Sequence, residues 1–451
     1  MLEALRAHGR EVAVVGLASS GVAATHLLRE HGLAVYASDA GQGEALATRA
    51  AGLRAAGADV QLGGHDLARL ARAQLVVLSP GVPPDAPPYA AAAAAGVPIV
   101  SEVDLGFTAL RGTRVVGLTG TNGKTTTTSL VRDVLRAMGH ADAVAAGNIG
   151  LPLAEVARAA AHPSWVALEL SSFQLHDCPH VAPDVGVLTN LAPNHLDRYP
   201  TLDAYYADKR LLFRHATAAS RWVTNADNAD SVALVAGIPG RHLRFSTTTR
   251  ADGWYDRARR LLMLDDAPLL ERDRLPLLGD HNVENALAAA LVGAHLGATP
   301  AAIVDALVHF VPIAHRVEPL REVDGVLWVN DSKSTNVTST EVAVAALDRP
   351  FVLLLGGKHK GEPYTRLLPR LAGRCRAVVA YGEAAPLIRA DLGTGLDVRD
   401  GGTRFADVVA LARDLARAGD AVLLSPACSS FDMFTGYEQR GEAFRALVAG
   451  L

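Results

Sequence analysis

The sequence has little of what marks secreted, membrane or nucleic-acid-binding proteins. It contains only three cysteines, Cys178, Cys375 and Cys428, and their wide spacing excludes a disulfide framework and a cysteine-rich metal site. No apolar run is long enough to span a membrane, and the N-terminus has no apolar signal core. The net charge of −4 argues against a nucleic-acid-binding surface. We therefore expect a soluble, cytoplasmic protein that binds neither membranes nor nucleic acids.

What the sequence does contain is ample apolar material for large cores. Hydrophobic residues make up 49% of the 451 residues and charged residues 20%, which disfavours disorder. A chain of this length is expected to form two to four domains.

The most informative stretch is a glycine-rich turn between a strand-like and a helix-like segment. The apolar run 115–118 leads into the turn, and a helical pattern follows over 127–138. The turn is a variant of the phosphate-binding loop, in which glycines let backbone N–H groups surround a polyphosphate. A glycine-rich turn with an exposed lysine is the simpler alternative, but the flanking elements favour a nucleotide. The candidate nucleotide-binding residues are Gly120, Thr121, Asn122, Gly123, Lys124, Thr125 and Thr126, with Lys124 on the phosphates and Thr125 on Mg²⁺.

Polar residues also follow two further apolar strands of this region. Glu169 ends the predicted strand 165–170, and a carboxylate there is a good metal ligand beside bound phosphates. His195 follows the predicted strand 185–191. A lone histidine is more often structural, but this position favours a second Mg²⁺ or a substrate. Lys209, on a helical pattern over 205–213, is by itself expected to be a solvated lysine.

Two asparagines, Asn282 and Asn285, lie one helical turn apart before the alanine-rich helix predicted over 286–296. Both amides could face one planar group, and adenine is the candidate because an amide pairs a donor with an acceptor in one plane. Helix capping by Asp280 or Asn282 is the alternative, and it is compatible with ligand contact.

The N-terminal region opens as a Rossmann-like β-α-β unit. A strand over 11–15 leads into the turn 16–21, and a second strand over 35–39 ends in Asp39. Ala18 stands where the second glycine of a dinucleotide fingerprint belongs, so a smaller ligand such as a UDP-sugar diphosphate is favoured. A tight turn with no ligand remains the alternative. The candidate substrate residues at the strand ends are Ser19, Ser79 and Gly81.

The C-terminal region repeats the alternation of strands and helices. Apolar runs over 326–332, 351–357, 377–382 and 421–426 each end in polar or small residues. We therefore predict an α/β protein of three domains: a Rossmann-like domain over 1–108, a central P-loop ATPase-like domain over 109–312, and a second Rossmann-like domain over 313–451.

Together these motifs resemble the Mur ligase family, which builds the peptide of bacterial cell-wall precursors, and the resemblance covers essentially the whole chain. The asparagine of the loop 119–126 separates it from ordinary kinases and GTPases. Four further stretches are similar to the D-glutamate-adding branch of the family, and they span 169–175, 330–336, 425–432 and 437–441. The Asp-Asn-Pro-Arg-like stretch expected of a diaminopimelate- or lysine-adding relative is absent.

The resemblance implies a role for each matching residue. It places Lys124 on the ATP phosphates, Thr125 and Glu169 on one Mg²⁺, and His195 on a second. It makes Lys209 a carbamylated lysine near the metals. The remaining roles are Asn148 near ATP and metal; Asn282 and Asn285 at adenine; His315, Arg316, Asp331 and Lys333 closing over the nucleotide; Thr335, Lys360 and Ser430 on the D-glutamate side chain; and Tyr437 as an aromatic contact to the amino acid.

Two positions depart from the family pattern. The first loop has Ala18 in place of a glycine, and Ala40-Gly41 replace a Thr-Arg-like pair that contacts uracil. Uracil contacts are therefore expected to come partly from elsewhere.

The implied reaction is ATP-dependent and uses UDP-N-acetylmuramoyl-L-alanine and D-glutamate. An acyl phosphate forms on the substrate carboxylate, and the amine of D-glutamate displaces phosphate; we expect a monomer. Three alternatives remain open at this point: a folylpolyglutamate synthase-like ligase, a nucleotide-dependent binding or regulatory protein, and a dehydrogenase module at the N-terminus.

Overall fold

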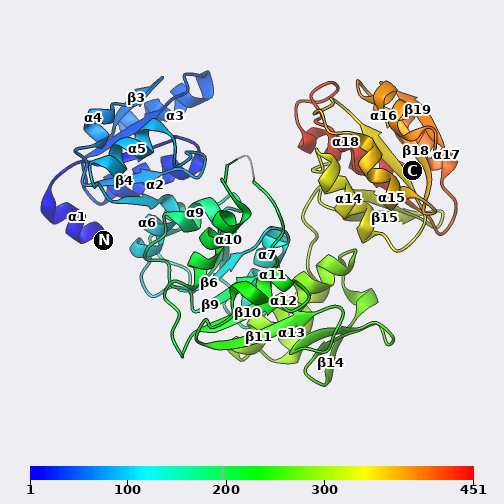
Figure 1. Ribbon diagram of the computed structural model, residues 1–451, viewed down its shortest axis with the longest axis horizontal. Coiled ribbons are helices and arrows are strands. Elements are labelled where there is room, and N and C mark those ends of the chain that lie inside the picture. The colour runs from blue at the N-terminus through cyan, green and yellow to red at the C-terminus, as the bar shows by residue number, and fades with distance from the viewer. Residues whose placement is uncertain (196–197) are drawn as a thin grey trace. The chain divides into compact units, whose positions relative to one another are not determined.

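The computed structural model describes residues 1–195 and 198–451, which form two compact units. The first unit comprises Met1–Arg272 and Glu284–Val308, and the second comprises Asp273–Val283 and His309–Leu451. The first unit holds two sheets and the second holds a third (Figure 1). The predicted α/β fold class is confirmed. The predicted domain boundaries at 108 and 312 stay predictions.

The N-terminal sheet of the first unit, blue in Figure 1, has five parallel strands in the order β3-β2-β1-β4-β5. They are β1 (Val12–Val15), β2 (Val35–Asp39), β3 (Asp59–Leu62), β4 (Leu75–Leu78) and β5 (Ile99–Ser101). The accompanying helices are α1 (Leu2–His8), α2 (Ser19–Glu30), α3 (Glu44–Ala55), α4 (Leu67–Leu70), α5 (Pro87–Ala94) and α6 (Glu102–Ala109). The order reverses direction at β1 and β4, the position where such sheets bind ligands.

The second sheet of this unit has nine strands in the order β14-β13-β12-β11-β10-β9-β6-β8-β7. The pairs from β7 to β12 are parallel, whereas β12, β13 and β14 pair antiparallel. The strands are β6 (Arg114–Thr119), β7 (Val144–Gly147), β8 (Trp165–Glu169), β9 (Val185–Leu188), β10 (Arg221–Asn225), β11 (Arg241–Ser246), β12 (Gly253–Asp256), β13 (Leu261–Leu264) and β14 (Ala267–Glu271).

Several helices follow α6 and precede the third sheet. The division between the two units falls inside one of them, α12. The helices are α7 (Lys124–Ala137), α8 (Leu153–Ala157), α9 (Ser172–His176), α10 (Leu202–Arg210), η1 (Leu211–Phe213), α11 (Ala229–Leu234), η2 (Arg272–Arg274), α12 (Asp280–Leu296) and α13 (Pro300–Val308).

The third sheet lies in the second unit and has six strands in the order β15-β16-β20-β17-β18-β19. Strands β15 (Glu318–Val323) and β16 (Val326–Asn330) are antiparallel, and the other pairs are parallel. The remaining elements are β17 (Phe351–Gly356), β18 (Cys375–Tyr381), β19 (Val398–Gly402), β20 (Ala421–Leu424), α14 (Val337–Ala346), η3 (Tyr364–Leu367), α15 (Leu368–Leu371), α16 (Ala385–Leu392), α17 (Phe405–Leu415) and α18 (Tyr437–Ala449).

The central parallel strands, such as β1, β4, β9, β17 and β20, are apolar and buried along their whole length because both faces of their sheets are covered. In β1, Val12 and Val14 pack into one core and Ala13 and Val15 into another. Burial of both faces leaves the carboxyl ends of the strands as the place where polar groups can collect.

Several predicted bounds are wrong in detail. Strand β9 ends at Leu188 and does not reach residue 191, and α12 begins at Asp280 instead of residue 286. Asn282 therefore lies inside the helix and is not its N-cap. The antiparallel extension of β12, β13 and β14 was not predicted. Among the described residues, no helix is both long enough and apolar enough to cross a membrane.

Candidate active site

The predicted phosphate loop connects β6 to α7, as the sequence indicated. Gly120 and Gly123 adopt φ angles of 148° and 80°, and both are crowded. A Cβ on Gly120 would lie 2.0 Å from Oγ1 of Thr189, and one on Gly123 would lie 2.4 Å from Oδ1 of Asn285. A side chain is excluded at both positions, so the glycines are required by conformation and by space.

The residues that follow β9 hold the phosphate loop through hydrogen bonds. The amide of Asn122 donates to Oδ1 of Asn190 at 2.9 Å, and the Thr189 hydroxyl donates to the Asn122 carbonyl at 2.6 Å. The amide of Thr121 donates to the Asn190 carbonyl at 2.8 Å. Strand β9 stops at Leu188 because its next two residues serve the loop. The sequence analysis did not identify Thr189 and Asn190 as site residues, although polar residues directly after a buried strand indicate such a role.

Two lysines meet at one carbonyl of this loop. The Nζ of Lys124 donates to the Gly120 carbonyl at 3.0 Å and to that of Thr121 at 2.9 Å. The Nζ of Lys209 donates to the same Gly120 carbonyl at 2.7 Å. Burial lowers the pKa of Lys209 well below its ordinary value, and the charge of Lys124 lowers that pKa further. The charge of Lys124 beside this carbonyl makes the place suited to polyanions.

The expectation that Lys209 is solvated is wrong. Only 1% of Lys209 is exposed, and its Nζ lies 4.7 Å from the ring centre of Tyr205. Helical patterning could not reveal this, because the burial comes from the phosphate loop rather than from the face of α10. A buried amine with a lowered pKa is the form that reacts with CO₂, so the geometry is compatible with the predicted carbamylation, which stays a prediction.

Glu169 ends β8 beside the loop and is 1% exposed. Its Oε1 accepts from the Asn148 side chain at 2.9 Å. Its Oε2 is buried and has no hydrogen-bond partner among the described residues. Asn148 is fixed in turn, because its amide donates to the Glu169 carbonyl at 3.0 Å and the preceding Gly147 packs too closely on that carbonyl for a side chain.

An unpartnered buried carboxylate oxygen is costly unless a cation completes it. Among the described residues, no group of three or more His, Cys, Asp or Glu side chains could hold a metal ion. Mg²⁺ in nucleotide sites nevertheless needs only one or two protein ligands, because waters and phosphates supply the rest. Glu169, at the end of β8, and Thr125, in the first turn of α7 after the adjacent strand β6, fit that requirement.

His195 lies on the loop after β9, the other neighbour of β6. Its φ of 55° is in the left-handed region, which a non-glycine residue rarely adopts. Its ring makes edge contacts with Phe173 and Tyr205, at centroid distances of 5.1 and 6.0 Å. Strain of this kind is concentrated at functional sites, which agrees with the predicted ligand role.

The two asparagines of α12 are both buried. Oδ1 of Asn285 accepts from the Thr127 hydroxyl at 3.0 Å, so this amide packs on the first turn of α7. Asn282 donates to the Leu278 carbonyl at 2.8 Å. Their contact with adenine stays a prediction.

At the edge of the N-terminal sheet, the loops after β1 and β4 are joined. The Ser79 hydroxyl donates to the Gly16 carbonyl at 2.8 Å, and a Cβ on Gly16 would lie 2.8 Å from that of Ser79. Ser19 and Gly81 are exposed beside these loops. Asp39, after β2, accepts from the Leu17 amide at 2.7 Å and the Gly41 amide at 2.8 Å. The edge is thus preorganised, as a ligand site requires, and its ligand stays a prediction.

In the second unit, the residues predicted to bind the amino-acid substrate come from three loops at one sheet edge. The Nζ of Lys360 donates to the Thr335 hydroxyl at 3.3 Å. Ser430 lies on the loop after β20, which is bridged to the loop after β17 by hydrogen bonds between Lys358 and Ser429 at 2.8 and 3.1 Å. Lys360 is exposed, whereas Ser430 is only 2% exposed.

Lys333 and Tyr437 are also neighbours in this unit. The Nζ of Lys333 lies 5.5 Å from the centre of the Tyr437 ring, and His315 meets that ring edge-on at 6.2 Å. Arg316 is exposed, while the flanking His315 and Val317 adopt φ angles of 63° and 43°. This strained segment places a buried histidine beside an exposed arginine.

The environment of Asp331 differs from that of a solvent-facing ligand. It is 2% exposed and accepts from the Ser425 hydroxyl at 2.7 Å and the Val317 amide at 3.1 Å. Burial raises the pKa of Asp331 to about 6. These bonds fix the strained segment, so the side chain supports the loops around it, and its predicted nucleotide contact remains a prediction.

Comparison with known proteins agrees with this geometry. Three family models match the chain in order: the Mur ligase MurD-like N-terminal domain over residues 10–101, the Mur ligase middle domain over 118–293, and the Mur ligase glutamate ligase domain over 315–428. The chain belongs to the Mur ligase family. The predicted resemblance is thereby confirmed along nearly the whole sequence.

Curated relatives match the chain from end to end. UDP-N-acetylmuramoylalanine–D-glutamate ligase of Acidobacterium capsulatum is 39% identical over 446 residues, covering 98% of this chain and 96% of the relative. The proteins of the same name from Myxococcus xanthus and Anaeromyxobacter dehalogenans are 39% and 40% identical, each over 98% of this chain, and 99% and 97% of the respective relative.

Solved structures share the fold at lower identity. UDP-N-acetylmuramate-alanine ligase MurC of Thermotoga maritima matches with a TM-score of 0.60 and 20% identity, covering 98% of this chain and all of that one. MurF of Acinetobacter baumannii matches with a TM-score of 0.60 and 16% identity, covering 97% and 93%.

Proposed function

We propose that this protein is an ATP-dependent ligase that joins D-glutamate to UDP-N-acetylmuramoyl-L-alanine in the synthesis of peptidoglycan precursors. The observation that carries the proposal is the end-to-end likeness to curated ligases of that name, at 39% identity over 98% of the chain. The phosphate loop, with Lys124 and the buried Lys209, supplies the matching chemistry. We also propose that the protein acts in the cytoplasm, where ATP is available.

In the first step, a carboxylate oxygen of the UDP-linked substrate attacks the γ-phosphorus of ATP. The bond to the β-phosphate oxygen breaks, ADP leaves, and an acyl phosphate remains. A carboxylate is a poor electrophile, and phosphorylation gives it a leaving group. The two reactants are both anions, so Lys124 and the amides of the loop lower the repulsion between them.

Mg²⁺ fits this site through Thr125 and Glu169, with His195 as the ligand proposed for a second ion. When bound, it supplies positive charge that offsets the crowding of phosphate and carboxylate oxygens. The unpartnered Oε2 of Glu169 supports this assignment. Asn148 orients the same carboxylate through its bond to Oε1.

In the second step, the neutral amine of D-glutamate attacks the acyl carbon. The tetrahedral intermediate loses phosphate, the nitrogen loses a proton, and an amide remains. We assign Thr335, Lys360 and Ser430 to the side-chain carboxylate of D-glutamate and Tyr437 to an aromatic contact with it. The reaction needs no covalent intermediate on the protein, so catalysis here consists of positioning and electrostatics.

A phosphate-release assay with a panel of acceptors tests the proposal. Purified protein, ATP and Mg²⁺ are combined with UDP-N-acetylmuramoyl-L-alanine and, in turn, D-glutamate, L-glutamate, L-lysine and diaminopimelate. Release only with D-glutamate is expected. Release with a different amino acid, or only when a folate replaces the UDP-substrate, would overturn the assigned substrate. ATP binding without acceptor-dependent release would favour a non-catalytic nucleotide-binding protein.

A further inference from the structure

One arginine of the second unit is completely buried without serving any step of the proposed reaction. Arg440 lies in the first turn of α18 and is 0% exposed. It belongs to the stretch 437–441 that the sequence singled out, in which only Tyr437 has so far received a role. A buried guanidinium is costly unless its donors are satisfied, so its acceptors show what it does.

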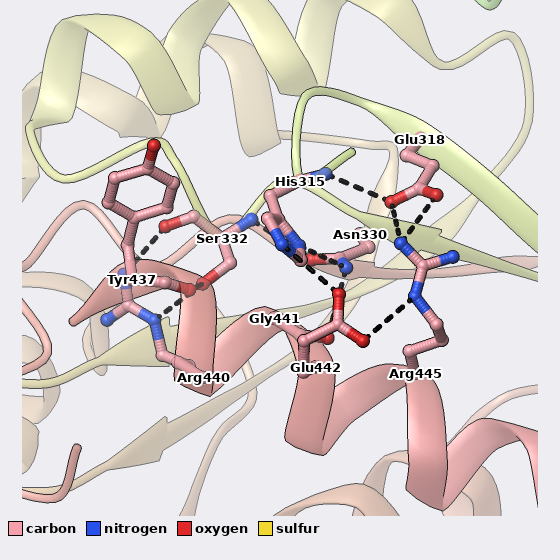
Figure 2. Close-up of polar contacts among 9 residues, drawn as sticks. All are labelled: His315, Glu318, Asn330, Ser332, Tyr437, Arg440, Gly441, Glu442 and Arg445. Atoms are coloured by element: carbon pink, nitrogen blue, oxygen red, sulfur yellow. Dashed lines mark hydrogen bonds and ion pairs between the residues drawn. The ribbon is translucent and has the colours of Figure 1, made fainter. Parts of the chain in front are cut away.

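The acceptors of Arg440 come from two separate loops. Its Nε donates to the Ser332 hydroxyl at 2.9 Å, and its Nη2 donates to the Ser332 carbonyl at 2.8 Å (Figure 2). Its Nη1 donates to the Cys428 carbonyl at 3.2 Å. The Ser332 hydroxyl in turn donates to the Tyr437 carbonyl at 2.8 Å. One side chain thus ties the loop after β16 to the loop after β20.

These two loops carry the residues assigned to the amino acid. Thr335 lies three residues after Ser332. Cys428 lies two residues before Ser430. The loop with Lys360 joins the same assembly, because Lys358 and Ser429 are bridged through their backbones.

Helix α18 is itself pinned at the adjacent residue, so Arg440 cannot slide along the sheet edge. The Asn330 side chain donates to the Gly441 carbonyl at 3.2 Å and to Nδ1 of His315 at 3.0 Å (Figure 2). A Cβ on Gly441 would lie 2.1 Å from that Nδ1. The position of Arg440 is therefore also set by the end of β16 and by His315, in addition to its own bonds to the two loops.

We propose that Arg440 is a positioning residue for the amino-acid site: it fixes the separation of the loop carrying Lys333 and Thr335 from the loop carrying Ser430, so that both hold one dicarboxylic amino acid. The inference rests on the proposed function. Arginine suits the task because its donors point in several fixed directions and can hold two loops at once. A lysine ammonium could satisfy one loop but not both in the same geometry.

A buried arginine that merely stabilised the unit would affect all substrates alike. A positioning role predicts that KM for D-glutamate changes while KM for ATP and for the UDP-substrate does not. The split between these constants, measured below the unfolding temperature of every variant, separates the two roles.

The experiment compares wild-type protein with Arg440→Lys and Arg440→Met. The control is Arg376→Met, which removes another arginine of the same sheet. Arg376 pairs with the buried Asp420 at 2.8 Å at the opposite, amino ends of β18 and β20. We expect Arg440→Met to raise KM for D-glutamate about tenfold or more, Arg440→Lys to raise it less, and Arg376→Met to leave it within about twofold of wild type, whatever its loss of thermal stability.

The outcomes separate the two proposals. Wild-type protein that releases no phosphate with D-glutamate overturns the proposed function before any variant is measured. An active wild type with an unchanged KM for D-glutamate in Arg440→Lys and Arg440→Met overturns the role of Arg440 alone. An equal rise in all three KM values does the same, because it marks a purely structural residue. If Arg440→Met does not fold, Arg440→Lys decides by the same criterion.

Discussion

The two units differ in the hydrogen-bond partners of their charged side chains. In the first unit, Lys209 shares one carbonyl with Lys124, and Glu169 keeps an oxygen without a partner among the described residues. In the second unit, Asp331 accepts from a hydroxyl and an amide, and Arg440 donates to two loops. All but Lys124 are almost completely buried.

The difference separates ligand-binding groups from supporting groups. A cation can complete a buried carboxylate oxygen that lacks a partner among the described residues, as Oε2 of Glu169 does, and this supports the metal site proposed for the first unit. A buried charge completed by the protein holds the loops around it in place. Substitutions in the first set are therefore expected to remove activity, and substitutions in the second to alter stability or geometry.

The largest effect is expected at Lys124. Lys124→Ala removes the cation of the phosphate loop and should lower the rate of ADP formation by about a thousandfold or more, because phosphoryl transfer depends on charge neutralisation. The unfolding temperature should change little. Coupled ADP assays and thermal unfolding measure the two quantities, and wild-type ADP formation by the Lys124→Ala variant would contradict the role of the loop.

The next effect concerns Lys209. Lys209→Ala should lower activity about a hundredfold, and short carboxylic acids such as acetate should restore part of it by replacing the anion of a carbamylated side chain. Steady-state rates are measured with increasing acetate. Lys124→Ala is the control, since acetate cannot replace a cation. Wild-type activity in Lys209→Ala, or loss of activity that no carboxylate restores, would count against carbamylation.

Two matched substitutions, Glu169→Gln and Asp331→Asn, test the difference between the two units directly. Glu169→Gln should lower activity about a hundredfold with little loss of stability, because its Oε2 has no partner to lose among the described residues. Asp331→Asn should destabilise the fold by about 1–3 kcal/mol, because its amide would face donors that now meet a carboxylate. Urea unfolding and phosphate release are measured on both. If the Glu169→Gln variant is the less stable of the two, the distinction between ligand-binding and supporting charges is contradicted.

The last effect lies away from the reaction and concerns stability alone, at Glu102 in the first turn of α6. Glu102 is 1% exposed, and its Oε1 accepts from the Ala154 amide at 2.6 Å. Burial raises the pKa of Glu102 from 4.5 to about 7. The unfolded chain loses this proton first, so the free energy of unfolding should fall as pH rises from about 4.5 to about 7 and then level off.

Glu102→Gln removes that dependence. The variant should exceed wild type in stability at pH 8 by at most about 3 kcal/mol and match it near pH 4.5. Urea unfolding at both pH values measures this. Glu3→Gln is the control, because Glu3 is exposed and pairs with an exposed arginine. Greater destabilisation by Glu102→Gln at pH 8 than near pH 4.5 would contradict this account, because it would show that the folded protein needs the charged carboxylate.

Features set by the backbone could be predicted from the sequence. Gly120 and Gly123 mark the phosphate loop because only glycine fits their φ angles and their space. The buried strands could be read as apolar runs because both faces of each parallel sheet are covered. Glu169 and His195 were found because they follow such strands.

Features set by contacts between distant segments could not be predicted. Lys209 is buried by a loop 89 residues away in the sequence, and Arg440 reaches Ser332 across 108 residues. Neither contact leaves a periodic pattern on its own helix. The early end of β9 has the same cause, since Thr189 leaves the strand to bind the phosphate loop.

The central claim is that the phosphate loop activates a carboxylate by phosphorylation. The most direct test is transfer of oxygen from that carboxylate to phosphate. UDP-N-acetylmuramoyl-L-alanine labelled with ¹⁸O in its carboxylate is incubated with ATP, D-glutamate and the protein, and the released phosphate is analysed by mass spectrometry. An acyl phosphate predicts one ¹⁸O in each phosphate released. Unlabelled phosphate formed together with the amide product would contradict the account.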